Sequence, residues 1–249
     1  MTTTSRARSF DGAAADYAAN RPSYPPALLD AVEELAGFPL AGARVADIGA
    51  GTGLGTALLD ARGAGVTAVE PGDGMAAQFR RFLPGVPLVR GDGDHLPLKS
   101  GSLDLLTYAQ AWHWTDPDLS VPEARRVLRP GGALALWWND SDAAVPWIAD
   151  QDARLRRFFG GAETSFDARS ARFRRLPPAL GWATRQVSWS RRVPLGVHLA
   201  NLGSYSDFLV RDKEEAHGFL AGERERLAGV FPDGTVEETY VVSLAVAHP

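Results

Sequence analysis

The stretch VADIGAGTG, residues 45–53, decides the fold of this chain. Apolar residues lead into Asp47, and glycines then occupy positions 49, 51 and 53. Glycine weakens strands and helices because it loses much conformational freedom on folding, so three glycines in five residues need a structural reason. Glycine also adopts backbone conformations closed to other residues and lets the chain approach a ligand. We therefore predict a strand that ends in a tight turn able to contact a ligand.

The segments around this turn alternate between strand and helix patterns. Apolar runs and helical spacing predict strands over residues 43–50, 65–71, 86–93, 103–111 and 133–139, and helices over residues 25–37, 54–64, 74–83 and 118–128. Nearly continuous apolar strands separated by helices are typical of a parallel sheet covered on both faces. We therefore predict an α/β fold, an open and mostly parallel Rossmann-like sheet.

Beyond Asn139 the sequence becomes rich in arginine, tryptophan and phenylalanine, and its periodicity is mixed. The predicted elements of this half are helices over residues 146–160, 204–210 and 214–231 and strands over residues 185–195 and 235–249. Residues 151–192 hold ten arginines against three acidic residues. These arginines either hold an acidic substrate or form a solvated face that balances the acidic remainder of the chain.

The composition excludes several classes of protein. The chain has 249 residues, a formal net charge of −4 and no cysteine. Disulfides and the usual zinc and iron–sulfur ligand sets are therefore excluded, and we predict no metal site and a reducing, cytoplasmic location. No apolar run approaches the roughly 18 residues that span a membrane. The mildly acidic balance argues against a nucleic-acid partner, and the oligomeric state stays open.

The spacing of the glycines separates candidate ligands. A dinucleotide fingerprint needs a third glycine at position 54, where this chain has Leu54, and a phosphate-binding loop of the Walker type needs a lysine that is absent. The arrangement D-x-G-x-G-x-G from Asp47 to Gly53 resembles motif I of the class I S-adenosylmethionine-dependent methyltransferases. A tight strand-to-helix turn without any ligand is the alternative.

Three further segments strengthen this resemblance: FDGAAADYAANRPSYP (10–25), AQAWHWTDP (109–117) and RRVLRPGGALAL (125–136). They resemble a subgroup that methylates small molecules, which includes trans-aconitate methyltransferase-like and natural-product methyltransferases of secondary metabolism. The resemblance is strong over about residues 10–140 and covers the remainder only in outline. It implies a transferase that uses S-adenosylmethionine and releases S-adenosylhomocysteine, built on a seven-stranded sheet whose last strand is antiparallel.

The resemblance also implies how the chain is organised. Residues 1–249 would form one domain with an N-terminal segment (1–30) that covers the cofactor. Residues 43–139 would form the cofactor-binding core. Residues 140–230 would supply a helical cap over the substrate and the last elements of the sheet.

The resemblance assigns the nucleoside part of the cofactor to two strand ends. Glu70 would accept the ribose hydroxyls, and Asp92 with the N–H of Gly93 would hold the adenine. Pro71 and Met75 would cover the adenine face with apolar surface. A solvated acid at the strand end and a simple Gly/Asp turn are the alternatives.

The amino-acid part of the cofactor would lie against the glycine turn. Its amine would meet the Gly49 carbonyl, and Asp47 would orient the turn rather than bind the donor. Arg21, four residues after Tyr17 in Y-x-x-x-R-P, would pair with the tail carboxylate, unless it forms a surface salt bridge. The end of the fourth strand would contact the methionine part through Ala109 and Gln110.

The chemistry of methyl transfer needs a base only if the acceptor must lose a proton. His113, in the tripeptide WHW, is either that base or a lining residue of the pocket. Trp112 and Trp114 would wall the substrate pocket, pointing opposite to His113 if the strand continues that far. Trp147 and Tyr205 are further candidates for the pocket.

The sequence therefore predicts the transfer of a methyl group to an oxygen or carbon atom of a small molecule. Two alternatives use the same cofactor site: a non-methylating cyclase, and a binding protein that retains the cofactor. An RNA methyltransferase that uses the arginines as a phosphate track is a third. The identity of the acceptor stays open.

Overall fold

The computed structural model describes residues 20–160, 176–209 and 211–249, and these contain a seven-stranded sheet in the order β3-β2-β1-β4-β5-β7-β6. The strands are β1 (Arg44–Ile48), β2 (Gly65–Glu70), β3 (Leu88–Arg90), β4 (Leu103–Ala109), β5 (Leu128–Ser141), β6 (Ala183–Pro194) and β7 (Thr235–Ala247). The first five pair in parallel, and β7 runs antiparallel to both β5 and β6. The predicted Rossmann-like sheet with an antiparallel last strand is confirmed.

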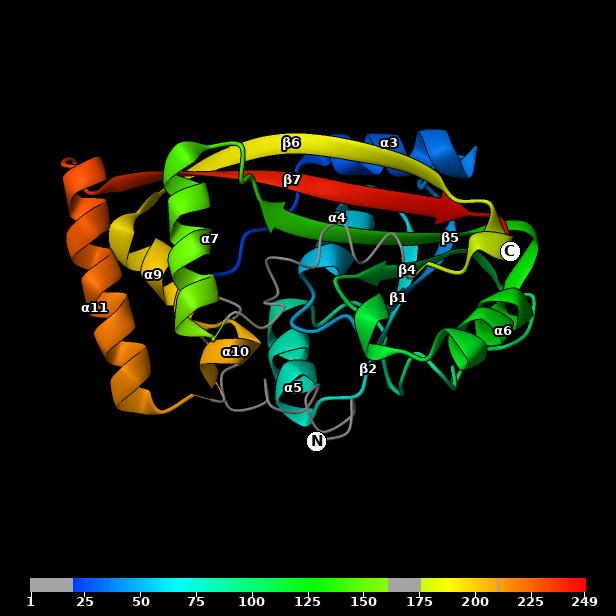
Figure 1. The fold of residues 1–249 in the computed structure, drawn as a ribbon. Coiled ribbons are helices and arrows are strands. Elements are labelled where there is room, and N and C mark those ends of the chain that lie inside the picture. Colours follow the sequence, from blue (N-terminus) through cyan, green and yellow to red (C-terminus); the bar gives the residue numbers. More distant parts are fainter. Residues whose placement is uncertain (1–19, 161–175, 210) are drawn as a thin grey trace.

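Helices lie on both faces of the sheet (Figure 1). The helices of the first half are α3 (Pro26–Ala36), α4 (Leu54–Ala61), α5 (Asp73–Phe82) and α6 (Pro117–Val127). One core cluster joins α3 and α4 to one face, and a second joins α6 to the other. Each face therefore has its own apolar core, as a parallel sheet requires.

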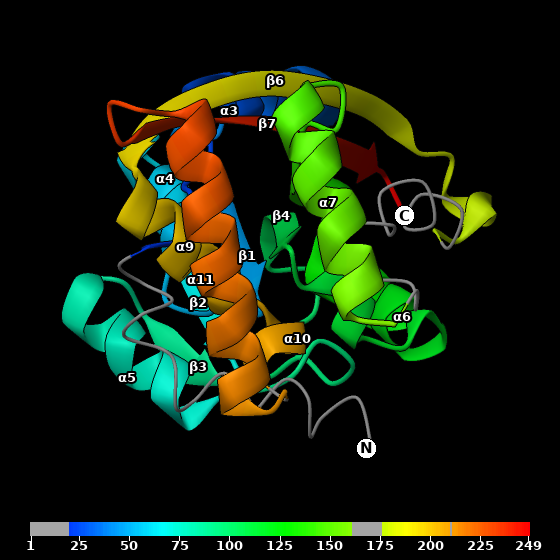
Figure 2. The same cartoon turned by 60° about the vertical axis from the view of Figure 1, so that its left-hand side comes forward.

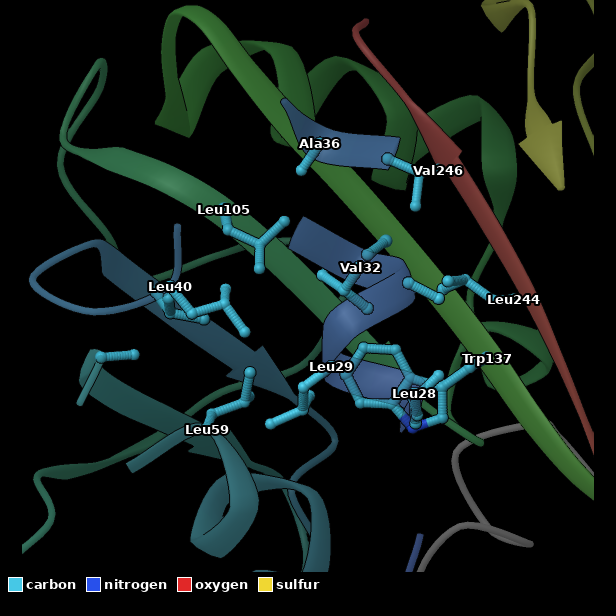
Figure 3. Packing of buried hydrophobic residues seen from close by; sticks show 14 of the residues in the cluster. Leu28, Leu29, Val32, Ala36, Leu40, Leu59, Leu105, Trp137, Leu244 and Val246 are labelled. Carbon is cyan, nitrogen blue, oxygen red and sulfur yellow. The ribbon is translucent and has the colours of Figure 1, made fainter. Parts of the chain in front are cut away.

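The core beneath α3 shows why this helix forms where it does (Figure 3). Its Leu28 and Val32 are fully buried and pack against Leu105, Trp137 and Leu244 of the sheet. Burying such a side chain contributes roughly 1.5–3 kcal/mol, so the stripe holds the helix on the sheet. The helix begins after a proline and ends at Gly37, whose φ is 78°.

The helices of the second half gather beyond one end of the sheet (Figure 2). They are α7 (Pro146–Phe158), α9 (Leu195–Gly203), α10 (Ser206–Leu209) and α11 (Lys213–Val230). Helix α11 packs against α9 and α7, and α7 follows directly from the carboxyl end of β5. We call α7, α9, α10 and α11 the cap. None of the helices in the described ranges is both long and apolar enough to cross a membrane.

Some element boundaries differ from the sequence prediction. Strand β3 has three residues where residues 86–93 were predicted, and β4 ends at Ala109 rather than at residue 111. Helix α9 was not predicted, because polar residues interrupt its apolar pattern. The tripeptide WHW forms a 3-10 turn, η2 (Trp112–Trp114), and a second such turn, η3 (Pro178–Leu180), precedes β6.

The strand order places the glycine turn at a special position. The chain builds β1, β2 and β3 toward one edge and then returns to place β4 on the other side of β1. At such a reversal the loops that follow the two central strands diverge, which leaves a crevice at their carboxyl ends. The turn after β1 and the loop after β4 therefore flank the expected ligand-binding position.

Candidate functional site

The glycine turn after β1 adopts a backbone that other residues rarely take. The φ angles of Gly49, Gly51 and Gly53 are 65°, 59° and 96°. A Cβ built on Gly49 would lie 2.6 Å from the Cβ of Ala111, whereas one built on Gly51 would meet no atom within 4 Å. Gly49 is thus required by the contact with the loop after β4, and Gly51 faces open space where a ligand can approach.

Glu70 joins this turn to the end of β2. Its carboxylate accepts hydrogen bonds from the N–H groups of Gly51 at 2.8 Å and of Gly72 at 2.7 Å. The side chain is buried, with 5% of its surface exposed. An ionised carboxylate accepts hydrogen bonds through both of its oxygens, and here Oε2 accepts from Gly51 and Oε1 from Gly72. The acid predicted to hold the ribose therefore lies against the glycine turn.

Asp47 lies beneath the turn and is fully buried. Its carboxylate accepts hydrogen bonds from the hydroxyls of Thr56 at 2.6 Å and Thr107 at 2.9 Å, which join α4 and β4 to β1. Burial raises the pKa of Asp47 to about 6, although the two threonine hydrogen bonds oppose the rise. The side chain thus connects β1 to α4 and β4 beneath the turn, and its orienting role toward the cofactor stays a prediction.

Gln110 follows β4 with a φ of 61°, the only positive φ at a non-glycine residue in the described ranges. Its N–H donates to the Trp137 carbonyl at 2.9 Å, and its side-chain Nε2 donates to the Asn139 carbonyl at 3.2 Å. Such backbone conformations cost about 1–3 kcal/mol and cluster at functional sites. The loop predicted to meet the methionine part of the cofactor is therefore held under strain by β5.

Three buried polar atoms in and beside this turn have no hydrogen-bond partner among the described residues. They are Thr52 Oγ1 in the turn and Trp137 Nε1 and Asn139 Nδ2 on β5. A buried polar group without a partner costs about 1–3 kcal/mol, so each such group needs an explanation. A polar molecule bound at this edge of the sheet could supply the missing hydrogen-bond partners. The strained loop at Gln110 and the open space at Gly51 are consistent with such a ligand.

The predicted adenine residues are arranged mainly by their own turn. Asp92 is exposed, and its Oδ1 accepts from the N–H groups of Asp94 at 3.0 Å and His95 at 2.9 Å. Gly93 is buried, and its carbonyl accepts from the Tyr108 hydroxyl at 3.1 Å. This is the Gly/Asp turn that the sequence left open as an alternative, and its cofactor contact stays a prediction. Two further residues were predicted on the adenine face. Pro71 precedes helix α5 and is half-buried, and Met75 lies within α5 and is buried.

Arg21 lies beside the cap. Its guanidinium carbon is 4.4 Å from the centre of the Tyr205 ring, a cation–π contact. Its neighbour Asn20 accepts a hydrogen bond through its carbonyl from Arg191 of β6 at 3.0 Å. Tyr17 lies outside the described residues. The N-terminal segment is thus tied to the cap, and the carboxylate-binding role of Arg21 stays a prediction.

The WHW turn separates its three side chains differently from the prediction. Because β4 ends at Ala109, strand alternation does not reach the tripeptide. Trp112 is buried and packs edge-on against Tyr108, with ring centres 4.9 Å apart, in the core on the α6 face. His113 is exposed and its ring centre lies 4.6 Å from that of the half-buried Trp114. Trp112 therefore supports the sheet, while His113 and Trp114 remain at the surface of the loop.

A pocket opens between α7, α9 and the start of β7. It measures about 310 Å³, counting the space open to solvent. Trp147 and Tyr205, two of the predicted pocket residues, line it, and Ser141 brings in the end of β5. The other described lining residues are Ile148, Gln151, His198, Asn201, Leu202, Glu238, Thr239 and Tyr240. Since Gln110 bonds to Asn139, two residues before Ser141, the pocket begins close to the loop after β4.

Buried charges hold this pocket together. Glu238 on β7 accepts from Arg191 at 2.6 Å and from the Tyr240 hydroxyl at 2.8 Å, and its other oxygen lies 2.7 Å from His198 Nδ1. Burial alone would raise the pKa of Glu238, but the hydrogen bond and charge of His198, with Arg191 and Tyr240, hold it below its usual value. Burial raises the pKa of Tyr205 to about 12.

A second buried pair lies behind the first. Glu223 on α11 accepts from Arg154 Nε at 2.5 Å and Nη2 at 2.8 Å, and from Gln151 Nε2 at 3.2 Å. Two arginines of the basic stretch, Arg154 and Arg191, therefore serve internal ion pairs. Arg172, Arg174 and Arg175 lie outside the described residues.

The sequence prediction missed several residues of this pocket. His198 and Asn201 are three residues apart on α9 and share one face. Two polar residues at this spacing in an otherwise apolar helix were the available signal. Gln151 and Glu238 gave no comparable signal, because their partners in the pocket lie 40 or more residues away in the sequence.

Comparisons with known proteins agree with this architecture. Residues 46–136 match a family model described as a methyltransferase domain. An uncharacterized methyltransferase of Mycobacterium tuberculosis is 43% identical over 142 residues, which cover 57% of this chain and 56% of the relative. The match thus spans little more than half the length of either protein.

Two further matches extend the comparison. A demethylmenaquinone methyltransferase of Clavibacter sepedonicus is 37% identical over 102 residues, covering 39% of this chain and 42% of the relative. The structure of a provisionally assigned type II methyltransferase from Anaeromyxobacter dehalogenans superposes with a TM-score of 0.72 at 25% identity, covering 92% of this chain and 97% of that chain. Together, the fold and the matches support a class I methyltransferase.

Proposed function

We propose that this protein transfers a methyl group from S-adenosylmethionine to an oxygen or carbon atom of a small molecule in the cytoplasm. The observation that carries the proposal is the glycine turn at the reversal of strand order, joined at Gly51 to the carboxylate of Glu70. A turn with open backbone beside a buried acid at the next strand end suits a nucleoside with two ribose hydroxyls. The unpaired polar atoms near the turn support a polar ligand there.

The chain's own residues would bind and orient the reactants. Glu70 would accept the ribose hydroxyls while it fixes the glycine turn, and Asp47 would keep that turn in place from below. When bound, the cofactor supplies an activated methyl carbon, whose bond to sulfur breaks with the electron pair passing to sulfur as the acceptor atom bonds to the carbon. Gln110 and the cap would exclude water from the space between turn and pocket.

A small acceptor is supported by the similarity to a protein named demethylmenaquinone methyltransferase. The described lining forms a partly enclosed hollow rather than an exposed basic groove, and Arg154 and Arg191 are paired with buried acids. This arrangement favours a small molecule over RNA.

Binding of the demethylated cofactor tests the first half of the proposal. Isothermal titration of S-adenosylhomocysteine into the wild-type protein should show binding, and Glu70→Ala should weaken it more than about tenfold, because charge-assisted hydrogen bonds are lost. Asp60→Ala, which removes an exposed acid of α4, is the matched control and should leave the affinity unchanged. Absence of binding to the wild-type protein would refute the proposal.

Turnover tests the second half. The protein is incubated with S-adenosylmethionine and a panel of phenols and small carboxylates, and S-adenosylhomocysteine and methylated product are quantified together. Equal amounts of both products support transfer. If the cofactor binds and a product forms without S-adenosylhomocysteine, the result would indicate the non-methylating alternative.

A further inference from the structure

Helix α9 presents a buried polar face to the pocket. His198 and Asn201 point to the same side of the helix, and both line the pocket together with Tyr205, which follows the helix. The remaining buried residues of α9 are leucines. Burying polar groups among leucines is costly unless each finds a partner, so the partners of these side chains are informative.

Asn201 has a polar atom without a partner. Its side chain is 2% exposed, and its Oδ1 is buried and makes no hydrogen bond within the described part of the chain. An amide oxygen can accept two hydrogen bonds. Because the residue lines the pocket, a molecule that enters it can supply the missing donor.

Unlike Asn201, His198 has a partner for each of its ring nitrogens among the described residues. Its Nδ1 is 2.7 Å from Glu238 Oε1, so this nitrogen carries the proton that the carboxylate accepts. Its Nε2 is 3.1 Å from Gln151 Nε2, and the same amide nitrogen lies 3.2 Å from Glu223. Because Glu223 needs a donor, Gln151 presents its amide N–H groups to both partners, and His198 Nε2 accepts.

The electrostatic surroundings favour the same kind of ligand. Among the charges that act on Tyr205, that of Arg21 has the largest effect and favours a negative charge, whereas those of Glu238, Asp152 and Asp140 oppose one. The described residues that line the pocket include neither lysine nor arginine. An anionic group placed here would lose its hydration without a paired cation in the lining.

We propose that this pocket binds the methyl acceptor through a hydrogen-bond donor, a hydroxyl or amino group that donates to Asn201 Oδ1, and that it disfavours carboxylates. The inference deepens the proposed function and rests on it. It replaces the expectation that arginines hold an acidic substrate. Asn201 is a binding residue for the acceptor, and Glu238 fixes the orientation of His198 beside it.

Four aromatic probes of similar size test the proposal. Phenol and aniline carry a donor, fluorobenzene carries none, and benzoate is an anion. Saturation-transfer NMR on protein saturated with S-adenosylhomocysteine should show phenol and aniline binding more tightly than the other two. Asn201→Leu should weaken both by about three- to tenfold, the usual range for one hydrogen bond. Asn201→Asp keeps the acceptor oxygen and should retain phenol binding.

A stability measurement excludes a purely structural role for Asn201. Since its Oδ1 has no partner to lose, Asn201→Leu should melt at the wild-type temperature or above, while its affinity for phenol falls. Val230→Ala, an exposed change at the end of α11, is the control and should alter neither property. Asn201→Ala removes the same acceptor if the leucine variant does not fold.

Several outcomes would overturn the inference. The inference is wrong if benzoate binds at least as tightly as phenol, or if Asn201→Leu and wild type bind phenol with equal affinity. It is also wrong if none of the four probes binds. Calorimetry with S-adenosylhomocysteine on the same samples separates the two proposals. If the cofactor product binds while the probes fail, only the acceptor inference falls, whereas loss of cofactor binding removes the proposed function and the inference with it.

Discussion

The sheet from β1 to β5 and the cap build their halves of the site by different physical means. At the sheet, the site consists mainly of backbone: glycines with positive φ, a strained loop at Gln110 and strand ends. At the pocket, the structure depends on buried charged side chains, Glu223 with Arg154 in the cap and Glu238 with Arg191 on the adjoining strands β7 and β6. A ligand at the sheet is therefore recognised by backbone shape, and one at the cap by side-chain chemistry.

This difference predicts how each half fails. A backbone site is lost when a side chain is added where only glycine fits, while the rest of the sheet persists. A buried ion pair fails when one partner is removed, because the other charge is left without compensation. Changes in the two halves should thus affect cofactor binding and stability separately.

The largest expected effect is in the cap. Glu223→Ala should reduce the free energy of unfolding by about 3–5 kcal/mol, because it leaves Arg154 and Gln151 without their buried acceptor. Urea unfolding measures the change, and Glu225→Ala, an exposed acid on the same helix, should cost less than about 0.5 kcal/mol. Similar costs for both substitutions would show that the buried pair does not hold the cap.

Two glycines of the turn provide a matched pair at the sheet. Gly49→Ala should reduce the free energy of unfolding by about 3 kcal/mol, since strain at positive φ adds to the clash with Ala111. The added methyl group of Gly51→Ala meets no atom of the described residues within 4 Å, so this substitution should cost only about 1–2 kcal/mol, the strain alone.

The affinity for S-adenosylhomocysteine gives a second comparison of Gly49→Ala and Gly51→Ala. Both glycine variants should bind S-adenosylhomocysteine more weakly than wild type in calorimetry, Gly51→Ala because its new methyl group enters the space facing the ligand. Two results would contradict the geometry of the turn. One is an equal loss in the free energy of unfolding for both variants, and the other is an unchanged affinity of Gly51→Ala for S-adenosylhomocysteine.

The last comparison concerns pH. The pKa of Asp47 is raised by burial from its usual 3.8 to about 6, so the folded protein binds this proton more tightly than the unfolded chain. The contribution is present at low pH and is lost as the pH rises from about 4 through 6, by about 3 kcal/mol in all. Asp47→Asn stays neutral and should lack this loss.

Urea unfolding of wild type and Asp47→Asn at several pH values between 4 and 7 isolates the effect, because the other titrating groups cancel in the difference. The stability of wild type relative to the variant should fall across this range. Parallel curves for the two proteins would mean that Asp47 does not titrate as its burial implies.

Much of the sheet half could be predicted from the sequence. Apolar runs located the five parallel strands, and the glycine spacing located the turn after β1, because these signals are local in the chain. The place of Glu70 at the carboxyl end of β2 was also predicted, because the apolar run of this strand ends at that residue. The alternation of the WHW side chains was predicted only if the strand continued that far, and β4 ends at Ala109, before the 3-10 turn.

The cap could not be predicted in the same way. His198 meets Glu238 across 40 residues of sequence, and Arg154 meets Glu223 across 69. No local pattern specifies such partners, so the arginines could be interpreted as a binding surface for acids. Only the packing of α7 against α11 and the pairing of β6 with β7 showed that Arg154 and Arg191 pair with buried acids.

The sequence by itself determined the order of strands and helices and the position of the glycine turn. These properties depend on residues within a few positions of one another, where backbone preference and periodicity act directly. The tertiary structure alone decided which side chains form the pocket and which atoms, such as Asn201 Oδ1, remain available in it. Burial makes a polar atom without a partner costly, and burial is a property of the folded chain.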